Sequence, residues 1–165
     1  MSFCAQLLRL SADHARWLSQ LAGRRGAGPE DGIDRLLALW DTEILPHCRA
    51  EEEVLLPDLA RRLSEADALV VFTMGDHLVL RRMARDLRRA TGTSRVALAA
   101  ALAGKLSEHL TFEERTLLPA LQQTLGCDRL AELGDELIEA GHRSPRPADG
   151  RPVIHEASRK KGTKP

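Results

Sequence analysis

Apolar side chains recur at intervals of three and four residues along most of the chain. This spacing is typical of helices that bury one face, and it predicts helices over residues 3–22, 30–57, 66–90 and 95–123, with a shorter one over 127–140. Four long helices with short connections favour an all-α fold, an up-down-up-down antiparallel four-helix bundle with a short C-terminal helix. The apolar face stays in phase across Pro46, so we expect this proline to bend the second helix rather than end it.

Glycine and hydroxyl residues mark the expected connections between these helices. A Gly-rich loop follows the first helix, Ser64 is a candidate cap for the third, and Thr93 or Ser94 can cap the fourth. Gly126 closes the fourth helix. We therefore predict one domain over 1–140, followed by a basic tail over 141–165 that is rich in Pro and Gly and disordered.

Six ionisable side chains occupy positions on the predicted buried faces where a bundle core normally carries aliphatic residues. They are His14, His47, Glu51, His77, His109 and Glu113. Burying a carboxylate without a partner costs several kcal/mol in order of magnitude. A set of this kind at one level of a bundle therefore requires a compensating charge.

A repeated motif contains four of these residues. The segments 47–57 and 109–119 agree at six of eleven positions, and in each a His precedes a Glu-Glu pair by four residues and a Leu-Leu-Pro follows. Residues i and i+4 share one face of a helix. Asp13-His14 and Asp76-His77 are separated along the chain by nearly the same number of residues as the two copies of this motif. The repeating unit is therefore a helix with Asp-His followed by a helix with His-x3-Glu-Glu, and it occurs twice.

Imidazole and carboxylate groups that converge in this way are ligands for a pair of divalent cations. Two carboxylates can each bridge the two metals, and four imidazoles then supply two ligands to each; nitrogen and oxygen ligation suits iron, manganese or zinc. An isolated His on an apolar face is more often a hydrogen-bonded core residue, and an isolated His-x3-Glu pair is more often exposed. The repetition of both features favours the metal site.

Other polar residues near the motif are compatible with more than one role. Asp13 and Asp76 could orient the histidines or lie at the surface, and Glu52, Glu53 and Glu114 could do the same or face solvent. Trp17 and Trp40 fit core packing. We expect Cys48, which follows His47 directly, to point away from the site.

Composition limits the remaining possibilities. Lys plus Arg and Asp plus Glu both number 24, so the formal net charge is zero, which argues against a nucleic-acid or membrane-surface role. The sequence has no apolar run long enough for a membrane span and no secretory pattern at its start. Three cysteines without C-x-x-C spacing predict no disulfide framework, and a cytoplasmic location is the default expectation.

With these residues and spacings, the chain resembles the hemerythrin-like family of HHE cation-binding domains over about residues 10–120. The resemblance implies a non-haem di-iron centre with an oxygen or hydroxide bridge (Fe-O-Fe). His14 and His47 would bind one iron, His77 and His109 the other, and Glu51 and Glu113 would bridge them. Oxygen-carrying members have a further His where this chain has Thr73, so the chain is more similar to bacterial and sensor-type members.

The resemblance leaves several functions open. The first is binding or sensing of dioxygen or related redox ligands, such as nitric oxide or peroxide. An enzyme that removes peroxide or nitric oxide, or that handles iron in storage or repair, is the alternative. A third possibility is a metal-stabilised interaction module with the tail as its recruiting segment, and a fourth is a zinc site without a redox role.

Overall fold

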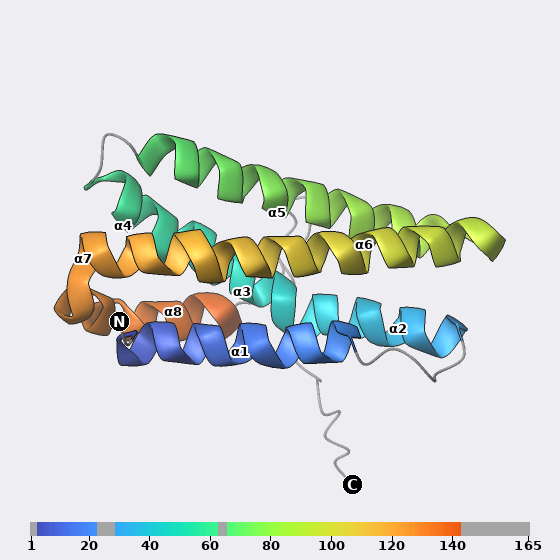
Figure 1. The fold of residues 1–165 in the computed structure, drawn as a ribbon, viewed down its shortest axis with the longest axis horizontal. Coiled ribbons are helices and arrows are strands. Elements are labelled where there is room, and N and C mark those ends of the chain that lie inside the picture. Colours follow the sequence, from blue (N-terminus) through green and yellow to red (C-terminus); the bar gives the residue numbers. More distant parts are fainter. Residues whose placement is uncertain (1–2, 23–28, 63–65, 143–165) are drawn as a thin grey trace, which may run out of the picture.

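The computed structural model describes residues 3–22, 29–62 and 66–142, and all regular elements in these ranges are helical (Figure 1). The elements are α1 (Ala5–Ala22), α2 (Pro29–Leu39), η1 (Trp40–Ile44), α3 (Leu45–Ala50), η2 (Glu51–Leu55), α4 (Leu56–Ala60), α5 (Ala66–Arg89), α6 (Gly92–Phe112), η3 (Glu113–Leu117), α7 (Leu118–Glu132) and α8 (Gly134–His142). The η elements are single π-helical turns, so residues 29–60 and 92–132 form two long, nearly continuous helical segments. The predicted all-α class is confirmed.

The helical segments lie alongside one another as a bundle (Figure 1). Helix α1 packs against α6 and α7, α5 packs against α4 and α6, and α2 packs against α6. The short helix α8 lies across α3 and η2, near α1 (Figure 1). Side chains from α1, α3, α5 and α6 therefore meet in the interior.

Each π-helical turn ends two residues before a proline. Pro46, Pro57 and Pro119 follow η1, η2 and η3, and after each turn the next N–H bonds to the carbonyl five residues back, as Leu56 does with Glu51. A proline inside a helix clashes with the carbonyl four residues back, and a wider turn relieves this clash. The helix therefore continues through Pro46 without a break.

Two apolar clusters fill the interior. One contains Leu7, Val54, Leu59 and Leu117 among others, and the other contains Trp17, Trp40, Leu80, Leu102 and neighbours. Along each of the segments that carry the predicted ligands, the polar positions fall between residues of the two clusters. The core is thus divided by a polar layer that contains the six predicted ligand residues. Both tryptophans pack in the core as expected, and the Trp17 ring lies 5.0 Å from the ring of His47.

Helix ends differ in detail from the expectations. Helix α6 begins at Gly92, whose φ is +60°, and its N-cap is Thr91. The hydroxyl of Ser94 donates to the Thr91 carbonyl at 2.8 Å, so the prediction that Thr93 or Ser94 is the cap is wrong. Gly126 has φ +71° and ψ 166°, and the helix kinks there. This left-handed conformation suits glycine, which has no Cβ.

The predicted helix over 127–140 is divided near Leu133, where α7 gives way to α8. The expected loop at 23–28, the cap at Ser64 and the tail from residue 143 lie outside the described residues.

A disulfide joins Cys4 to Cys127, with a Cα–Cα distance of 5.5 Å, so the prediction of no disulfide is wrong. The pairing depends on the packing of α1 against α7, which brings together residues 123 positions apart. The backbone N–H of Cys4 also donates to Gln122 Oε1 at 2.8 Å. Spacing along the chain carries no signal for such a contact.

Among the described residues, no helix is both long and apolar enough to cross a membrane.

Candidate metal centre

The structure brings the six predicted ligand residues together in the polar layer. His14 comes from α1, His47 from α3, His77 from α5 and His109 from α6, while Glu51 and Glu113 are the first residues of η2 and η3. Five of the six residues are fully buried, and His47 is 7% exposed. Burial of this kind means that the two carboxylates depend on the surrounding groups for charge compensation.

The two oxygens of each carboxylate face different pairs of histidines. Glu51 directs Oε1 toward His47 Nε2 and Oε2 toward His77 Nε2, both at 3.4 Å. Each carboxylate can therefore reach both sides of the centre.

Glu113 repeats this arrangement from the opposite segment. Its Oε2 lies 3.4 Å from His14 Nε2 and 3.6 Å from His47 Nε2. Its Oε1 lies 3.6 Å from His77 Nε2 and 2.8 Å from His109 Nε2. Glu113 therefore lies between the two histidine pairs, with one oxygen toward each pair.

The imidazoles are arranged in two similar pairs. His14 and His47 have ring centroids 4.8 Å apart, and so do His77 and His109, each pair with its rings nearly perpendicular. In the first pair the two Nε2 atoms are 3.1 Å apart. One of these nitrogens donates to the other in this arrangement, and once that proton is lost two imidazoles at this range can converge on one cation.

Several buried polar atoms at the centre have no hydrogen-bond partner within the described part of the chain. They are both carboxylate oxygens of Glu51 and of Glu113, Nε2 of His77, and both ring nitrogens of His109. The 2.8 Å approach of His109 Nε2 to Glu113 Oε1 is short but is not aligned as a hydrogen bond. Buried polar groups are normally satisfied, so these orphaned atoms fit a centre that holds cations.

Without a cation, protons take over the charge compensation. Burial alone would lower the pKa of His47, but the Glu51 carboxylate outweighs it and raises the pKa to about 9. Burial is likewise outweighed at His109, where Cys48 and Glu113 raise the pKa to about 10. Burial would raise the pKa of Glu113, yet the adjacent imidazoles of His109, His47 and His77 hold it well below its usual value.

Carboxylates outside the cluster orient two of the imidazoles. His14 Nδ1 lies 2.8 Å from Glu114 Oε1, and His77 Nδ1 lies 2.7 Å from Glu52 Oε1. His109 Nδ1 is 3.5 Å from Asp76 Oδ2, which is beyond a good hydrogen bond. A carboxylate on Nδ1 directs the Nε2 lone pair inward, as in many metal sites.

Asp13 and Thr73, the position of the further His in oxygen carriers, form hydrogen bonds to groups other than the histidines. Asp13 is 44% exposed in its side chain and pairs with Arg16 at 2.6 Å, so its predicted role in orienting a histidine is not what the structure shows. Thr73 is buried, and its hydroxyl donates to the Leu69 carbonyl of its own helix at 3.0 Å. The hydroxyl proton is thus engaged away from the imidazoles.

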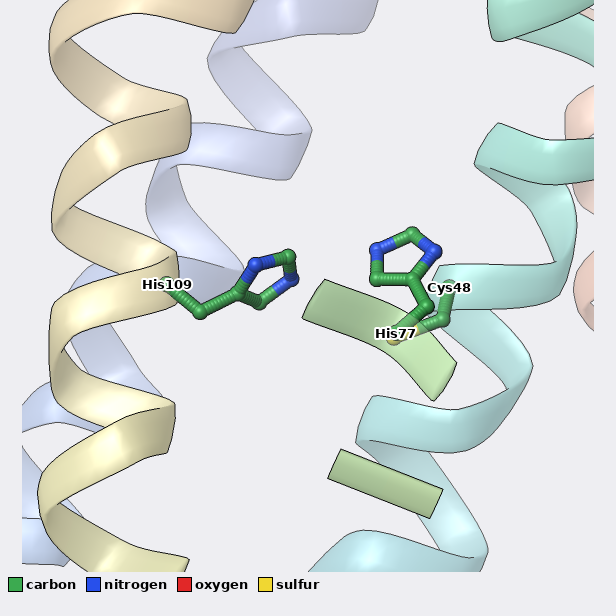
Figure 2. A group of neighbouring side chains, drawn as sticks. All are labelled: Cys48, His77 and His109. Carbon is green, nitrogen blue, oxygen red and sulfur yellow. The ribbon is translucent and has the colours of Figure 1, made fainter. Parts of the chain in front are cut away.

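Cys48 is the functional candidate that sequence reasoning missed. It is fully buried, and its Sγ lies within 4.8 Å of a ring nitrogen of His77 and of His109 (Figure 2). The expectation that it points away from the site is wrong: the Cys48 side chain points away from His47 but toward the second pair of histidines. Cys48 precedes Glu51 by three residues, and this spacing places both on one face of the helix.

A cleft reaches the centre from outside. It has a volume of about 560 Å³, lies between α1, α3 and α8, and has His47 in its wall together with Trp17, Glu43 and Arg16. The Glu43 carboxylate accepts hydrogen bonds from both Arg16 and the Trp17 indole. The slight exposure of His47 is consistent with approach of a small molecule from this side.

A helical bundle with four inward imidazoles and two buried carboxylates defines a cluster that could hold metal cations. The comparison with protein families agrees: the model of the Hemerythrin HHE cation-binding domain matches residues 6–121. The chain belongs to this family. No curated protein and no solved structure matches it significantly.

Proposed function

We propose that the chain binds two iron ions at this centre and uses them to bind or sense dioxygen or a related redox ligand, such as nitric oxide or peroxide. The supporting observation is that each carboxylate faces both sides of the centre. Glu113 directs one oxygen toward His14 and His47 and the other toward His77 and His109, and Glu51 directs one toward His47 and the other toward His77. A single ion beside one pair of histidines would leave the carboxylate oxygens that face the other pair buried without a compensating charge.

In this proposal the bundle has up-down-up-down topology and each helical segment contributes to the centre. His14 and His47 would hold the first iron, His77 and His109 would hold the second, and Glu51 and Glu113 would bridge the two. An iron pair supplies electrons that a small ligand can accept. Glu114 and Glu52 keep His14 and His77 in the tautomer whose Nε2 is free to coordinate. Zinc or manganese could use the same donors.

Thr73 and the cleft support exchange of a small ligand. Thr73 stands where oxygen carriers of the family have another His, and its hydroxyl donates to the Leu69 carbonyl of its own helix, so the second metal would have one imidazole fewer than in those carriers. The cleft beside His47 supplies a path. Cytoplasmic location and the absence of a nucleic-acid or membrane partner stay predictions.

Metal analysis of protein purified from iron-replete cells, together with its optical spectrum, tests the proposal. We expect about two irons per chain and ultraviolet bands of a bridged ferric pair, because two carboxylates can span two ions. The Glu51→Gln variant should lose much of this iron. The Glu53→Gln variant makes the same chemical change at an exposed position two residues away and should keep its iron. A wild-type chain that keeps fewer than one iron after aerobic and anaerobic loading would contradict the proposal.

Stopped-flow mixing of the reduced protein with dioxygen, nitric oxide and peroxide then separates binding from turnover. Binding or sensing predicts one spectral change per centre, which reverses when the ligand is removed. Consumption of many equivalents of peroxide or nitric oxide per chain would identify the enzyme alternative instead.

A further inference from the structure

We propose that Cys48 provides a thiolate ligand to the second metal, so that the two metal positions of the centre differ in chemistry. This inference rests on the proposed two-metal centre and adds a ligand to it. The first position is lined by His14 and His47 with the carboxylates, and the second by His77, His109 and the Cys48 sulfur.

The Cys48 sulfur is close enough to share a cation with the second imidazole pair. Its Sγ, one nitrogen of His77 and one nitrogen of His109 all lie within 4.8 Å of one another, and all three residues are fully buried (Figure 2). A zinc-type or iron-type ion sits about 2.3 Å from sulfur and about 2.0–2.1 Å from an imidazole nitrogen. Small movements of these side chains would therefore close a shell around one ion.

The ring nitrogens opposite the sulfur are available for coordination. Nε2 of His77 and both nitrogens of His109 are buried without a hydrogen-bond partner among the described residues. His77 Nδ1 is already held by Glu52, which leaves its Nε2 for a cation. Glu113 Oε1, at 3.6 Å from His77 Nε2 and 2.8 Å from His109 Nε2, completes a set of two nitrogens, one sulfur and one oxygen.

The helix that carries Cys48 explains why its sulfur reaches this position. Cys48 is one turn before Glu51 and Glu52, which contact His77 by Oε2 at 3.4 Å and by Oε1 at 2.7 Å. Residues three and four apart share a helix face, so all three side chains point toward α5. His47, next in sequence, turns instead toward α1 and His14.

A sulfur ligand changes what the second position selects. Thiolates favour softer ions such as zinc and ferrous iron, whereas a site of imidazole and carboxylate is harder. Coordination releases the thiol proton to solvent, since the thiolate is the ligating form. The two positions should then bind the same metal with different affinity and different spectra.

Cobalt(II) titration of the full metal-free chain under anaerobic conditions tests this inference. We expect a near-ultraviolet sulfur-to-cobalt charge-transfer band that grows with one of the two equivalents bound. Cys48→Ser and Cys48→Ala should abolish the band and weaken one of the two cobalt sites at least about tenfold, the lower range found for disturbed metal shells. The double variant Cys4→Ser/Cys127→Ser should keep the band, because those cysteines form the disulfide.

The outcomes separate this inference from the proposed function. Two bound cobalt ions without a charge-transfer band, or equal affinities in wild type and Cys48→Ser, would overturn the role of Cys48 and leave the two-metal centre intact. Failure of the wild type to bind cobalt or iron at all would overturn both. Circular dichroism checks that the variants are helical, and the wild-type spectrum decides the question even if a variant fails to fold.

Discussion

Glu52 Oε1 lies 2.7 Å from Nδ1 of His77, although the two residues belong to different halves of the internal repeat. The reciprocal contact joins Glu114 of the second half to His14 of the first at 2.8 Å. The second glutamate of each Glu-Glu pair thus orients a histidine of the other half, while the first glutamate reaches into the centre. The repeat therefore works as two interlocked units, and neither half has a complete set of its own.

Replacing Glu52 with Gln should lower metal affinity without removing a ligand. The amide cannot provide the charged acceptor that keeps the proton on His77 Nδ1, and loss of such contacts costs about 10–100-fold in affinity. Competition with a chelator measures the change, and Glu53→Gln is the matched control on an exposed face. Equal affinity for Glu52→Gln and Glu53→Gln would contradict a role for the Glu52–His77 contact.

Replacing Pro57 or Pro119 with Ala should also weaken metal binding. These prolines follow η2 and η3, the π-helical turns that begin at Glu51 and Glu113. An alanine restores the N–H and removes the ring clash, so the turn can tighten to α-helical spacing and change the direction of the carboxylate. We expect lower metal affinity with unchanged helical circular dichroism. A variant that binds two metals with wild-type affinity would show that the π-helical turn is not needed.

The six inward residues could be predicted because burial makes them conspicuous. Positions that recur every three or four residues on the buried face of a helix are normally apolar, so a carboxylate or imidazole there departs from the pattern. The same departure occurs in both His-x3-Glu segments, 47–51 and 109–113. The helices themselves followed from the same periodicity. What the structure adds is which atoms meet: one oxygen of each carboxylate faces the first pair of histidines and the other oxygen faces the second pair.

Features that depend on neighbouring helices could not be predicted in this way. Glu52 and Glu114 each sit one position from a buried glutamate, and only the packing of α5 and α1 decides whether they meet a histidine or solvent. The disulfide needs Cys4 and Cys127 to approach across 123 residues. Cys48 is different, since its spacing of three from Glu51 is present in the sequence and could have indicated the shared face.

The metal-free protein should lose stability as pH rises from neutral through 10. The pKa values of His47 and His109 are raised to about 9 and about 10 in the folded state, against about 6.5 in the unfolded chain. A raised pKa contributes stability that is complete below about 6.5 and is lost as pH rises through the folded value. Urea unfolding of chelator-treated protein at several pH values measures this.

Glu113 acts in the opposite direction at acid pH. Its lowered pKa contributes stability that is present above its unfolded value of about 4.3 and is lost as pH falls through the folded value.

Metal uptake near pH 7 should release protons from His47 and His109, because an imidazole must lose its proton to coordinate. Calorimetry in buffers of different ionisation enthalpy detects this release. A metal-free protein whose stability does not change between pH 7 and 10 would contradict the proton-for-metal exchange.

Removing the disulfide should lower the free energy of unfolding without loss of the metal centre. Cys4–Cys127 closes a loop of more than 100 residues, and disulfides typically contribute about 2–4 kcal/mol by restricting the unfolded chain. Cys4 lies ten residues before His14, a distance of about 15 Å along a helix, so the ligands keep their positions. We therefore expect Cys4→Ser to reduce the unfolding free energy under oxidising conditions only, with two metals still bound. Urea unfolding with and without reductant, compared with metal analysis of the same samples, checks both parts. The free energy of unfolding should fall by the same amount in reduced wild type and in oxidised Cys4→Ser. If reduction leaves the stability of the wild type unchanged, the disulfide does not stabilise the fold.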